Sequence, residues 1–513
     1  MAVYYKIIKD HYIDSLETLA QTTKLCDQPG IETGYVGMAT QTFKDIVSEI
    51  GLACDQILAA GEGDYVVAAK ADTEEAFEKA LKAISESASG ASSKTRQTYL
   101  TVEQAASARP QANLCQISVP GEFALDVAKR ALNAGMHLCV FSNNVPLEDE
   151  REMKELAREK GLLCMGPDCG VANINGSALV LSSIVNRGPF GIIGASGTGI
   201  QHVTAMLHEA GSGVSQAIGA GGNDIKEQVG GITMLMGIDA LEEDPETKYL
   251  ILIARKPAPS VLEKMLERLR SCRKPRVVYF MGCDRKAIED TGSIYAGNLD
   301  ECGERALELA GLACPLESEE EILALARKEA EGFAREQKYL RGAYSGGTYM
   351  DEAMRVMVDK IGPIWSNAPL EEAWRLEDSL KPRENACIDY GEEEFTLGRP
   401  HPAIDAGIRR PAILKEAADP EVAVITLDVV LTPPGHPDPA GFVVPDIIKA
   451  QEMARERGGK LVFIASLLGT TADYQDIRLQ EKKLRDAGAI VCRTNYRAAL
   501  LASEIIRLIR EKA

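Results

Sequence analysis

Two short glycine-rich turns contain the residues best suited to holding an anion. GASGTG, residues 194–199, separates an apolar run from a helix-like stretch, and SGGT, residues 345–348, has the same setting. Glycines let backbone N–H groups approach an anion closely, and the N-terminus of the following helix adds partial positive charge. The sequence therefore predicts anion-binding residues at Gly194, Ser196, Gly197, Thr198, Gly199, Gly346, Gly347 and Thr348.

Known motifs narrow the chemistry of the first turn. No Lys-Ser/Thr follows GASGTG, so it is not a Walker phosphate loop, and it lacks the G-x-G-x-x-G spacing of dinucleotide-binding proteins. It narrowly misses G-x-S-x-G, which makes Ser196 a weak nucleophile candidate. Taken alone, a tight strand-to-helix turn that binds nothing explains GASGTG equally well. The second copy favours turns that shape a site between two domains.

Other polar residues follow predicted strands. Asp224 ends GAGGND, Arg255 and Lys256 stand in ARKPAP, and Asp428 lies in LDVVL. We expect these four to contact substrate. The loop GEEEFTLGRPHP contains Arg399 and His401, and the proline-stiffened TPPGHPDPAG contains Gly435 and His436. Because proline fixes φ and lowers loop entropy, the latter suits a preorganised site. Gly435 joins the predicted anion-binding set.

The segments that position these loops alternate between strand-like and helix-like patterns. Strand, helix and strand at this rhythm predict parallel sheets with helices on both faces. The pattern also repeats: GPFGIIGASGTGIQHVTAMLHEAG matches YLRGAYSGGTYMDEAMRVMVDKIG, and a shared Asp-Pro-Glu fixes the register of DPETKYLILIARKPAP against DPEVAVITLDVVLTPPGHP. We therefore predict two similar doubly wound domains that face each other.

These patterns divide the 513 residues into five segments. We expect a small N-terminal α/β module at 1–95, a Rossmann-like domain at 96–185, a first doubly wound domain at 186–314, a charged helical connector at 315–340 and a second doubly wound domain at 341–513. The predicted fold class is α/β, with several doubly wound parallel-sheet domains of Rossmann-like and flavodoxin-like type.

Composition excludes some partners. A net charge of −19 argues against nucleic acid and anionic membranes, because a phosphate backbone needs a basic face. No apolar stretch reaches the length of a membrane helix, and the N-terminus lacks an apolar signal core, so we expect a cytoplasmic protein. The twelve cysteines are scattered, mostly in apolar runs, which fits reduced thiols; no matching His/Cys cluster predicts a metal site.

Several strings taken together resemble one family. SVPGEFALDVAKRALNAG, MGPDCG, GASGTGIQ, GAGGNDIKEQVGG, LGRPHPAID and LDVVL are similar to the FdrA proteins, fused relatives of the succinyl-CoA synthetases. The resemblance covers essentially the whole chain beyond residue 100. It implies a CoA-binding-like domain followed by two ligase-CoA-like domains. It also implies phosphate held between two helix N-termini, with Ser196–Thr198 at the first and the loop 432–441 near the second.

The chain departs from the synthetases at the positions that carry their phosphoryl relay. The stretch EDTGSIYAG has Asp290 or a neighbour where a phosphohistidine is expected, and Arg255 and Lys256 replace a glutamate. No nucleotide-binding ATP-grasp domain or glycine-rich CoA loop is evident. We therefore expect that phosphate is a substrate and that no phosphoryl group passes through a histidine. No cofactor is certain, and the case for CoA is weak.

By this resemblance the chain is a subunit of an oxamate carbamoyltransferase, converting oxalurate and phosphate into oxamate and carbamoyl phosphate with partner subunits. His436 or His401 would protonate the leaving oxamate nitrogen, and Arg399 or Arg255 would pair with its carboxylate. Two main alternatives stay open: an acyl-CoA ligase subunit that borrows its nucleotide domain, and a non-catalytic scaffold subunit. A dehydrogenase is the weakest alternative, because the chain lacks the G-x-G-x-x-G motif of dinucleotide-binding proteins.

Overall fold

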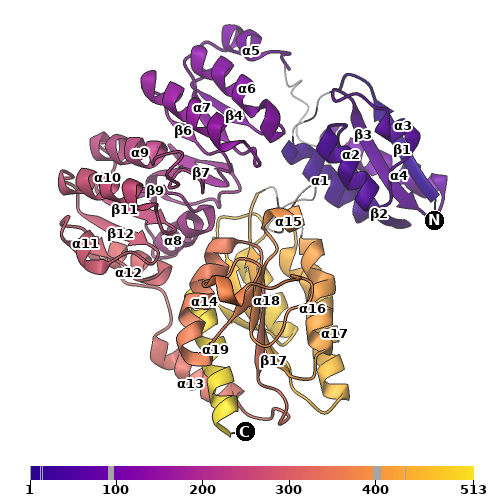
Figure 1. Ribbon diagram of the computed structural model, residues 1–513, viewed down its shortest axis with the longest axis vertical. Coiled ribbons are helices and arrows are strands. Elements are labelled where there is room, and N and C mark those ends of the chain that lie inside the picture. The colour runs from indigo at the N-terminus through magenta and orange to yellow at the C-terminus, as the bar shows by residue number, and fades with distance from the viewer. Residues whose placement is uncertain are drawn as a thin grey trace.

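The computed structural model describes residues 2–11, 13, 15–89, 98–396, 402, 406–433 and 435–512, and they form four sheets with their covering helices (Figure 1). We name the corresponding parts the N-terminal unit (2–89), the second unit (98–169), the third unit (170–314) and the fourth unit (336–512). The N-terminal unit, drawn in indigo, lies beside the second unit, and the fourth unit contains the yellow C-terminal helix.

The N-terminal unit is a three-stranded antiparallel sheet in the order β1-β3-β2. Successive residues of the central strand point to opposite faces, so Val67 joins a core with α1 and α4, and Val66 joins a second core with α2 and α3. The predicted strands and helices are present, but the antiparallel pairing was not predicted. The elements are β1 (Ala2–Ile8), α1 (Ser15–Cys26), β2 (Ile31–Met38), α2 (Gln41–Glu49), α3 (Asp55–Leu58), β3 (Tyr65–Ala71) and α4 (Glu74–Ser89).

The second unit is a short parallel sheet in the order β4-β5-β6, as the alternating pattern predicts. Helices α6 and α7 pack on each other and bury Leu132 and Met153 in one apolar cluster. The elements are α5 (Val102–Ala108), β4 (Leu114–Ile117), α6 (Gly121–Asn133), β5 (His137–Val140), α7 (Leu147–Glu159) and β6 (Cys164–Met165).

The third unit is a seven-stranded sheet in the order β13-β12-β11-β9-β10-β7-β8. Its strands from β13 to β10 are parallel, and the hairpin β7-β8 adds an antiparallel edge. Because β7 and β8 precede residue 185, sheet pairing starts this unit earlier than the expected boundary. The elements are β7 (Val171–Ile174), β8 (Ser177–Val180), β9 (Arg187–Gly194), α8 (Gly197–Glu209), β10 (Val214–Gly219), α9 (Ile232–Glu243), β11 (Tyr249–Ala254), α10 (Pro259–Arg270), β12 (Arg276–Phe280), α11 (Arg285–Glu289), β13 (Ile294–Tyr295) and α12 (Leu299–Leu309).

The fourth unit is a six-stranded parallel sheet in the order β15-β16-β14-β17-β18-β19. Helix α13 (Glu319–Glu329) precedes this sheet in the chain, and a capping box at Ser318 stabilises the N-terminus of the helix. The elements are β14 (Tyr339–Tyr344), α14 (Gly347–Ile361), β15 (Trp365–Ser366), η1 (Glu372–Trp374), β16 (Ala386–Asp389), α15 (Glu393–Thr396), η2 (Ala406–Ile408), α16 (Arg409–Ala418), β17 (Val422–Val430), α17 (Pro439–Glu456), β18 (Val462–Leu468), α18 (Ile477–Asp486), β19 (Ile490–Cys492) and α19 (Asn495–Lys512).

The third and fourth units share one strand order. When the edge strands β7, β8 and β15 are left out and the strand before each glycine turn is counted as the first, β10-β9-β11-β12-β13 and β16-β14-β17-β18-β19 both follow the flavodoxin-like order 2-1-3-4-5. The predicted fold class and the repeat of two doubly wound sheets are therefore confirmed. One apolar cluster spans both units and includes Val203 of α8, Met350 of α14 and Leu501 of α19. This shared core fixes the two glycine turns relative to each other.

Candidate functional site

The N-termini of α8 and α14 meet at the interface of the third and fourth units. Ser196 Oγ lies 2.9 Å from Thr348 Oγ1, and the same Ser196 oxygen caps α8 by accepting the N–H of Gly199 at 3.0 Å. A Cβ placed on Gly346 would lie only 3.1 Å from Thr198 Oγ1. The structure thus brings the two predicted turns together, and we call this place the glycine-turn junction (Ser196–Gly199 with Gly346–Thr348).

Backbone donors at the junction are free to bind a ligand. Within the described residues, no acceptor takes up the N–H groups of Gly197, Thr198, Gly347 or Thr348. Unpaired N–H groups in the first turn of a helix carry the positive end of its dipole, and here two helices contribute them from different units. The arrangement suits a small oxyanion such as a phosphate or a carboxylate.

Arg255 supplies a full positive charge beside α14. A Cβ on Gly347 would overlap Arg255 Nη2 and would lie 2.6 Å from Asp389 Oδ2, so glycine is needed for these side chains to approach the helix. Arg255 follows β11 of the third unit, whereas Asp389 ends β16 of the fourth. Arg255 Nε is buried and has no hydrogen-bond partner among the described residues. The guanidinium therefore retains capacity to bind a ligand.

Two carboxylates, Asp389 and Asp428, lie close to the second turn. The pKa of Asp389 is raised, and Asp428 is paired with an arginine. Burial, and next the nearby Glu392, raise the pKa of Asp389 to about 7, while a Gly391 N–H and Arg255 act in the opposite direction. Asp428 accepts Ser345 N–H at 2.9 Å and pairs with Arg409 at 2.6 Å. Asp389 was not predicted from the sequence, although its place at the end of β16 is a signal for a strand-end site.

Asp224 lies in a different environment from the one predicted for it. Its side chain is fully buried, and Lys154 of α7 contacts both Asp224 and Glu150 at 2.8 Å. Asp224 also accepts the N–H groups of Thr233 at 3.0 Å and Met234 at 2.9 Å, at the start of α9. The structure therefore uses this carboxylate to join the second and third units and does not bring it to the glycine-turn junction.

The loop that contains Gly435 and His436 is engaged elsewhere. His436 Nδ1 accepts Asp438 N–H at 3.0 Å, and its Nε2 lies 3.9 Å from Asp27 of the N-terminal unit. The first amides of α17 are occupied, because Gly441 donates to the Asp438 cap and Ala440 donates to Gln480. Helix α17 therefore offers fewer free donors than α14, which takes the place facing α8.

The remaining predicted residues are placed as follows. Lys256 is exposed, and Gly194 ends β9 so close to β11 that a Cβ would lie 2.9 Å from Ile253 O. Arg399 and His401 lie outside the described residues. Asp290, at the position expected for a phosphohistidine, forms an exposed pair with Lys286 at 2.7 Å.

A separate cavity of about 370 Å³ lies between the N-terminal and second units. Met38, Val119, Pro120 and Phe123 give it apolar walls, and Phe123 stands at the start of α6. Its other lining residues are Asp10, Thr40, Glu62 and Gly63.

Neither a metal cluster nor a membrane-crossing helix is found in the part of the chain that the structure describes. Within it, no three His, Cys, Asp or Glu side chains are grouped to hold a metal ion. None of the helices there combines the length and apolar character needed to cross a membrane.

Three family models match this chain. The model described as AllF, heavy metal-associated domain, matches residues 1–105, the CoA binding domain matches 186–282, and CoA-ligase matches 343–505. The first description raises the question of a metal. The cysteines of the N-terminal unit, Cys26 and Cys54, stand apart on α1 and before α3 and belong to no ligand group in the described residues, so this unit does not fit a heavy-metal site.

Relatives among known proteins agree with these models. The uncharacterized protein YahF of Escherichia coli is 38% identical over 514 residues, which cover 99% of each chain. The alpha subunit 1 of an ADP-forming succinate–CoA ligase from Archaeoglobus fulgidus is 32% identical over 36% of this chain and 62% of its own length. The alpha subunit of a malate–CoA ligase from Methylorubrum extorquens is 27% identical over 36% of this chain and 64% of its own.

Solved structures with similarity include an ATP citrate lyase from Methanothrix soehngenii. It is 12% identical with a TM-score of 0.37, and the match covers 81% of this chain and 85% of that one.

Proposed function

Since this chain belongs to the FdrA/AllF-like family of succinyl-CoA synthetase-like proteins, in which YahF matches it end to end, we propose that it is a CoA-ligase-like subunit that binds phosphate or an acyl phosphate at the glycine-turn junction. The main support for this proposal is the contact between Ser196 and Thr348, which brings two helix N-termini with free amides to one place. Relatives named as succinate–CoA and malate–CoA ligases favour the acyl group of a small carboxylic acid.

The proposed step is transfer between an acyl phosphate and the thiol of CoA. The thiol sulfur attacks the acyl carbon, a C–S bond forms, the bond from that carbon to the phosphate oxygen breaks, and inorganic phosphate leaves. The junction amides and Arg255 stabilise the negative charge on the departing phosphate. Asp389 is the nearby group suited to take the thiol proton, because burial raises its pKa to about 7.

The cavity beside Phe123 supplies apolar walls for the uncharged arm of CoA. Asp10 and Glu62 would repel the phosphates of CoA, so these would have to point away from that side of the cavity. The placement of CoA in this cavity is tested separately from the anion site, by CoA binding to a Phe123→Glu variant.

The function is tested by acyl transfer. The purified chain is incubated with acetyl phosphate and CoA, and thioester formation and phosphate release are followed together. The proposal expects equal amounts of both products and their loss in Ser196→Glu, whose carboxylate would occupy the junction. Phosphate release without thioester would contradict acyl transfer to CoA.

Carbamoyl transfer from oxalurate to phosphate is a second candidate, and it would use the same anion site. Arg255 at the junction favours it, because a guanidinium pairs with both phosphate and a carboxylate such as that of oxamate. Of its expected proton donors, His436 faces Asp27 and His401 lies outside the described residues. Stabilisation by carbamoyl phosphate together with oxamate, but not by CoA, would favour carbamoyl transfer over the CoA-ligase proposal.

A further inference from the structure

A network of buried polar side chains lies directly behind the glycine-turn junction. His202, further along α8 than Ser196, places its Nδ1 2.8 Å from the hydroxyl of Tyr349. Tyr349 follows Thr348 in α14. The helices that present the junction are therefore joined twice, by Ser196 with Thr348 at the turn and by His202 with Tyr349 beneath it.

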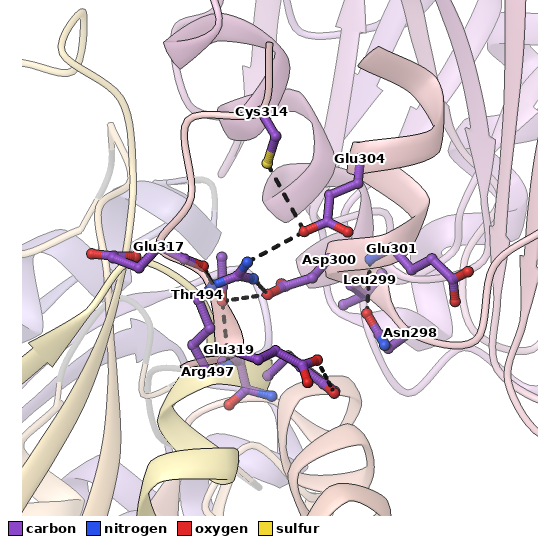
Figure 2. Close-up of polar contacts among 12 residues, drawn as sticks. Asn298, Leu299, Asp300, Glu301, Glu304, Cys314, Glu317, Glu319, Thr494 and Arg497 are labelled. Atoms are coloured by element: carbon purple, nitrogen blue, oxygen red, sulfur yellow. Dashed lines mark hydrogen bonds and ion pairs between the residues drawn. The ribbon is translucent and has the colours of Figure 1, made fainter. Parts of the chain in front are cut away.

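Asp300 lies beside the other nitrogen of the His202 ring. His202 Nε2 lies 3.0 Å from Asp300 Oδ1, and Thr494 Oγ1 donates to the second Asp300 oxygen at 2.7 Å. Figure 2 shows the guanidinium of Arg497, on α19, contacting both Asp300 and Glu304. His202 and Asp300 are each only 2% exposed, so these contacts are shielded from water.

The partners of His202 determine its hydrogen-bonding state. A carboxylate oxygen accepts hydrogen bonds, so the ring hydrogen of His202 is assigned to Nε2, which faces Asp300 Oδ1 in a contact whose angle does not make a hydrogen bond, and Nδ1 accepts the Tyr349 O–H. Within the described residues, the Tyr349 hydroxyl has no other hydrogen-bond partner. Losing the Nδ1 acceptor would leave a buried hydroxyl unpaired, which is costly.

The peptide that contains Tyr349 is also tied from the fourth unit. Asn495 Nδ2 donates to Tyr349 O at 2.8 Å and to Glu352 Oε2 at 2.9 Å. Glu352 Oε1 accepts Leu299 N–H at 2.9 Å, next to Asp300. The first turn of α14 is therefore fixed to α8, α12 and α19 by polar contacts that the mechanism above does not use.

We infer that His202 and Tyr349 are positioning residues, whose mutual hydrogen bond holds the amides of α8 and α14 at the spacing an oxyanion requires. The inference rests on the proposed anion site. It predicts that the affinity for an oxyanion depends on Nδ1 of His202 and not on Nε2. Nδ1 faces the other helix, whereas Nε2 faces Asp300 of the same unit.

Conservative replacements separate positioning from packing. An asparagine side chain places a polar atom about where Nδ1 lies, and a glutamine reaches about as far as Nε2. Sulfate binding to the full chain is measured by calorimetry for the wild type, His202→Asn, His202→Gln and Tyr349→Phe. Tyr65→Phe is the control, because it removes another buried hydroxyl, bonded to Gln21 in the N-terminal unit.

We expect His202→Gln and Tyr349→Phe each to weaken sulfate binding about fivefold or more, and His202→Asn to stay within about twofold of the wild type. The double variant His202→Gln/Tyr349→Phe should be no weaker than either single variant, because both remove the same bond. Tyr65→Phe should bind as the wild type does. Tyr349→Phe keeps the buried ring, so it tests the inference even if the histidine variants do not fold.

Two results would overturn the positioning inference alone, provided that the wild type binds sulfate. One is a sulfate affinity that is unchanged in Tyr349→Phe, and the other is an affinity in His202→Asn as weak as that in His202→Gln. A wild-type chain that binds neither sulfate nor phosphate would overturn the proposed anion site and this inference with it.

Discussion

Ser196 Oγ and Thr348 Oγ1 lie 2.9 Å apart, although 152 residues separate them in the chain. Each hydroxyl belongs to the glycine turn of one of two sheets with the same strand order. The contact therefore joins the N-cap residue of α8 to the first turn of α14, and an anion bound there would be held by both units at once.

Loss of the Ser196 hydroxyl is expected to weaken both the helix cap and the anion site. Ser196→Ala removes the acceptor for Gly199 N–H, which costs about 1 kcal/mol of stability. Ser318→Ala removes a similar cap from α13, away from the junction, and is the matched control. Both variants should unfold more easily, but only Ser196→Ala should lower phosphate affinity. Equal phosphate affinity in the two variants would argue against a role for Ser196 in binding.

A methyl group on Gly347 is expected to displace Arg255. The added Cβ would overlap the guanidinium and crowd Asp389, so Gly347→Ala should weaken phosphate binding about tenfold, as measured by calorimetry. Gly222→Ala is the control, because nothing lies within 4 Å of a Cβ at that position. Unchanged affinity in Gly347→Ala would mean that Arg255 does not contribute.

Anion affinity is expected to depend on pH through Asp389. Burial raises its pKa to about 7, so the carboxyl is neutral below that value and becomes negative as the pH rises through it. Sulfate, which stays fully ionised throughout, should therefore bind more tightly at pH 6 than at pH 8.

The same shift makes a prediction for stability. The folded state holds the Asp389 proton to higher pH than the unfolded chain does, so its contribution to stability is present below about pH 4 and declines as the pH rises to about 7. Asp389→Asn should remove this component and the pH dependence of sulfate affinity, both seen in denaturant titrations and calorimetry. Retention of the same pH profile in Asp389→Asn would assign it to another group.

Breaking the buried ion cluster is expected to destabilise the fold without touching the anion site. Lys154→Met leaves Glu150 and Asp224 buried without their cation, which costs about 3–5 kcal/mol. Lys129→Met removes an exposed pair with Glu152 and should cost less than about 1 kcal/mol. Denaturant unfolding gives both values. Weaker phosphate binding in a folded Asp224→Asn variant would restore the substrate role first expected for Asp224.

The sequence pattern predicted the repeated sheets because strand, glycine turn and helix are local signals. It also identified Ser196, Gly347, Thr348 and Arg255, which the fold brings together. Local sequence patterns could not predict which side chains contact each other across the interfaces between units. Asp224 looks like any strand-end carboxylate until Lys154 of another unit is found beside it, and Asp389 ends a strand without a distinctive motif. His202 resembles an ordinary helix residue, and only the packing of α8 on α14 reveals its link to Tyr349.

The central claim is that the glycine-turn junction binds an oxyanion, and a thermal-shift titration tests it most directly. The wild-type chain and Ser196→Glu would be titrated with phosphate, with chloride at equal ionic strength as the reference. A ligand that binds only the folded state raises the melting temperature with its concentration. The account predicts a phosphate-dependent rise in the wild type that is absent in Ser196→Glu. An equal rise in both, or none in the wild type, would contradict it.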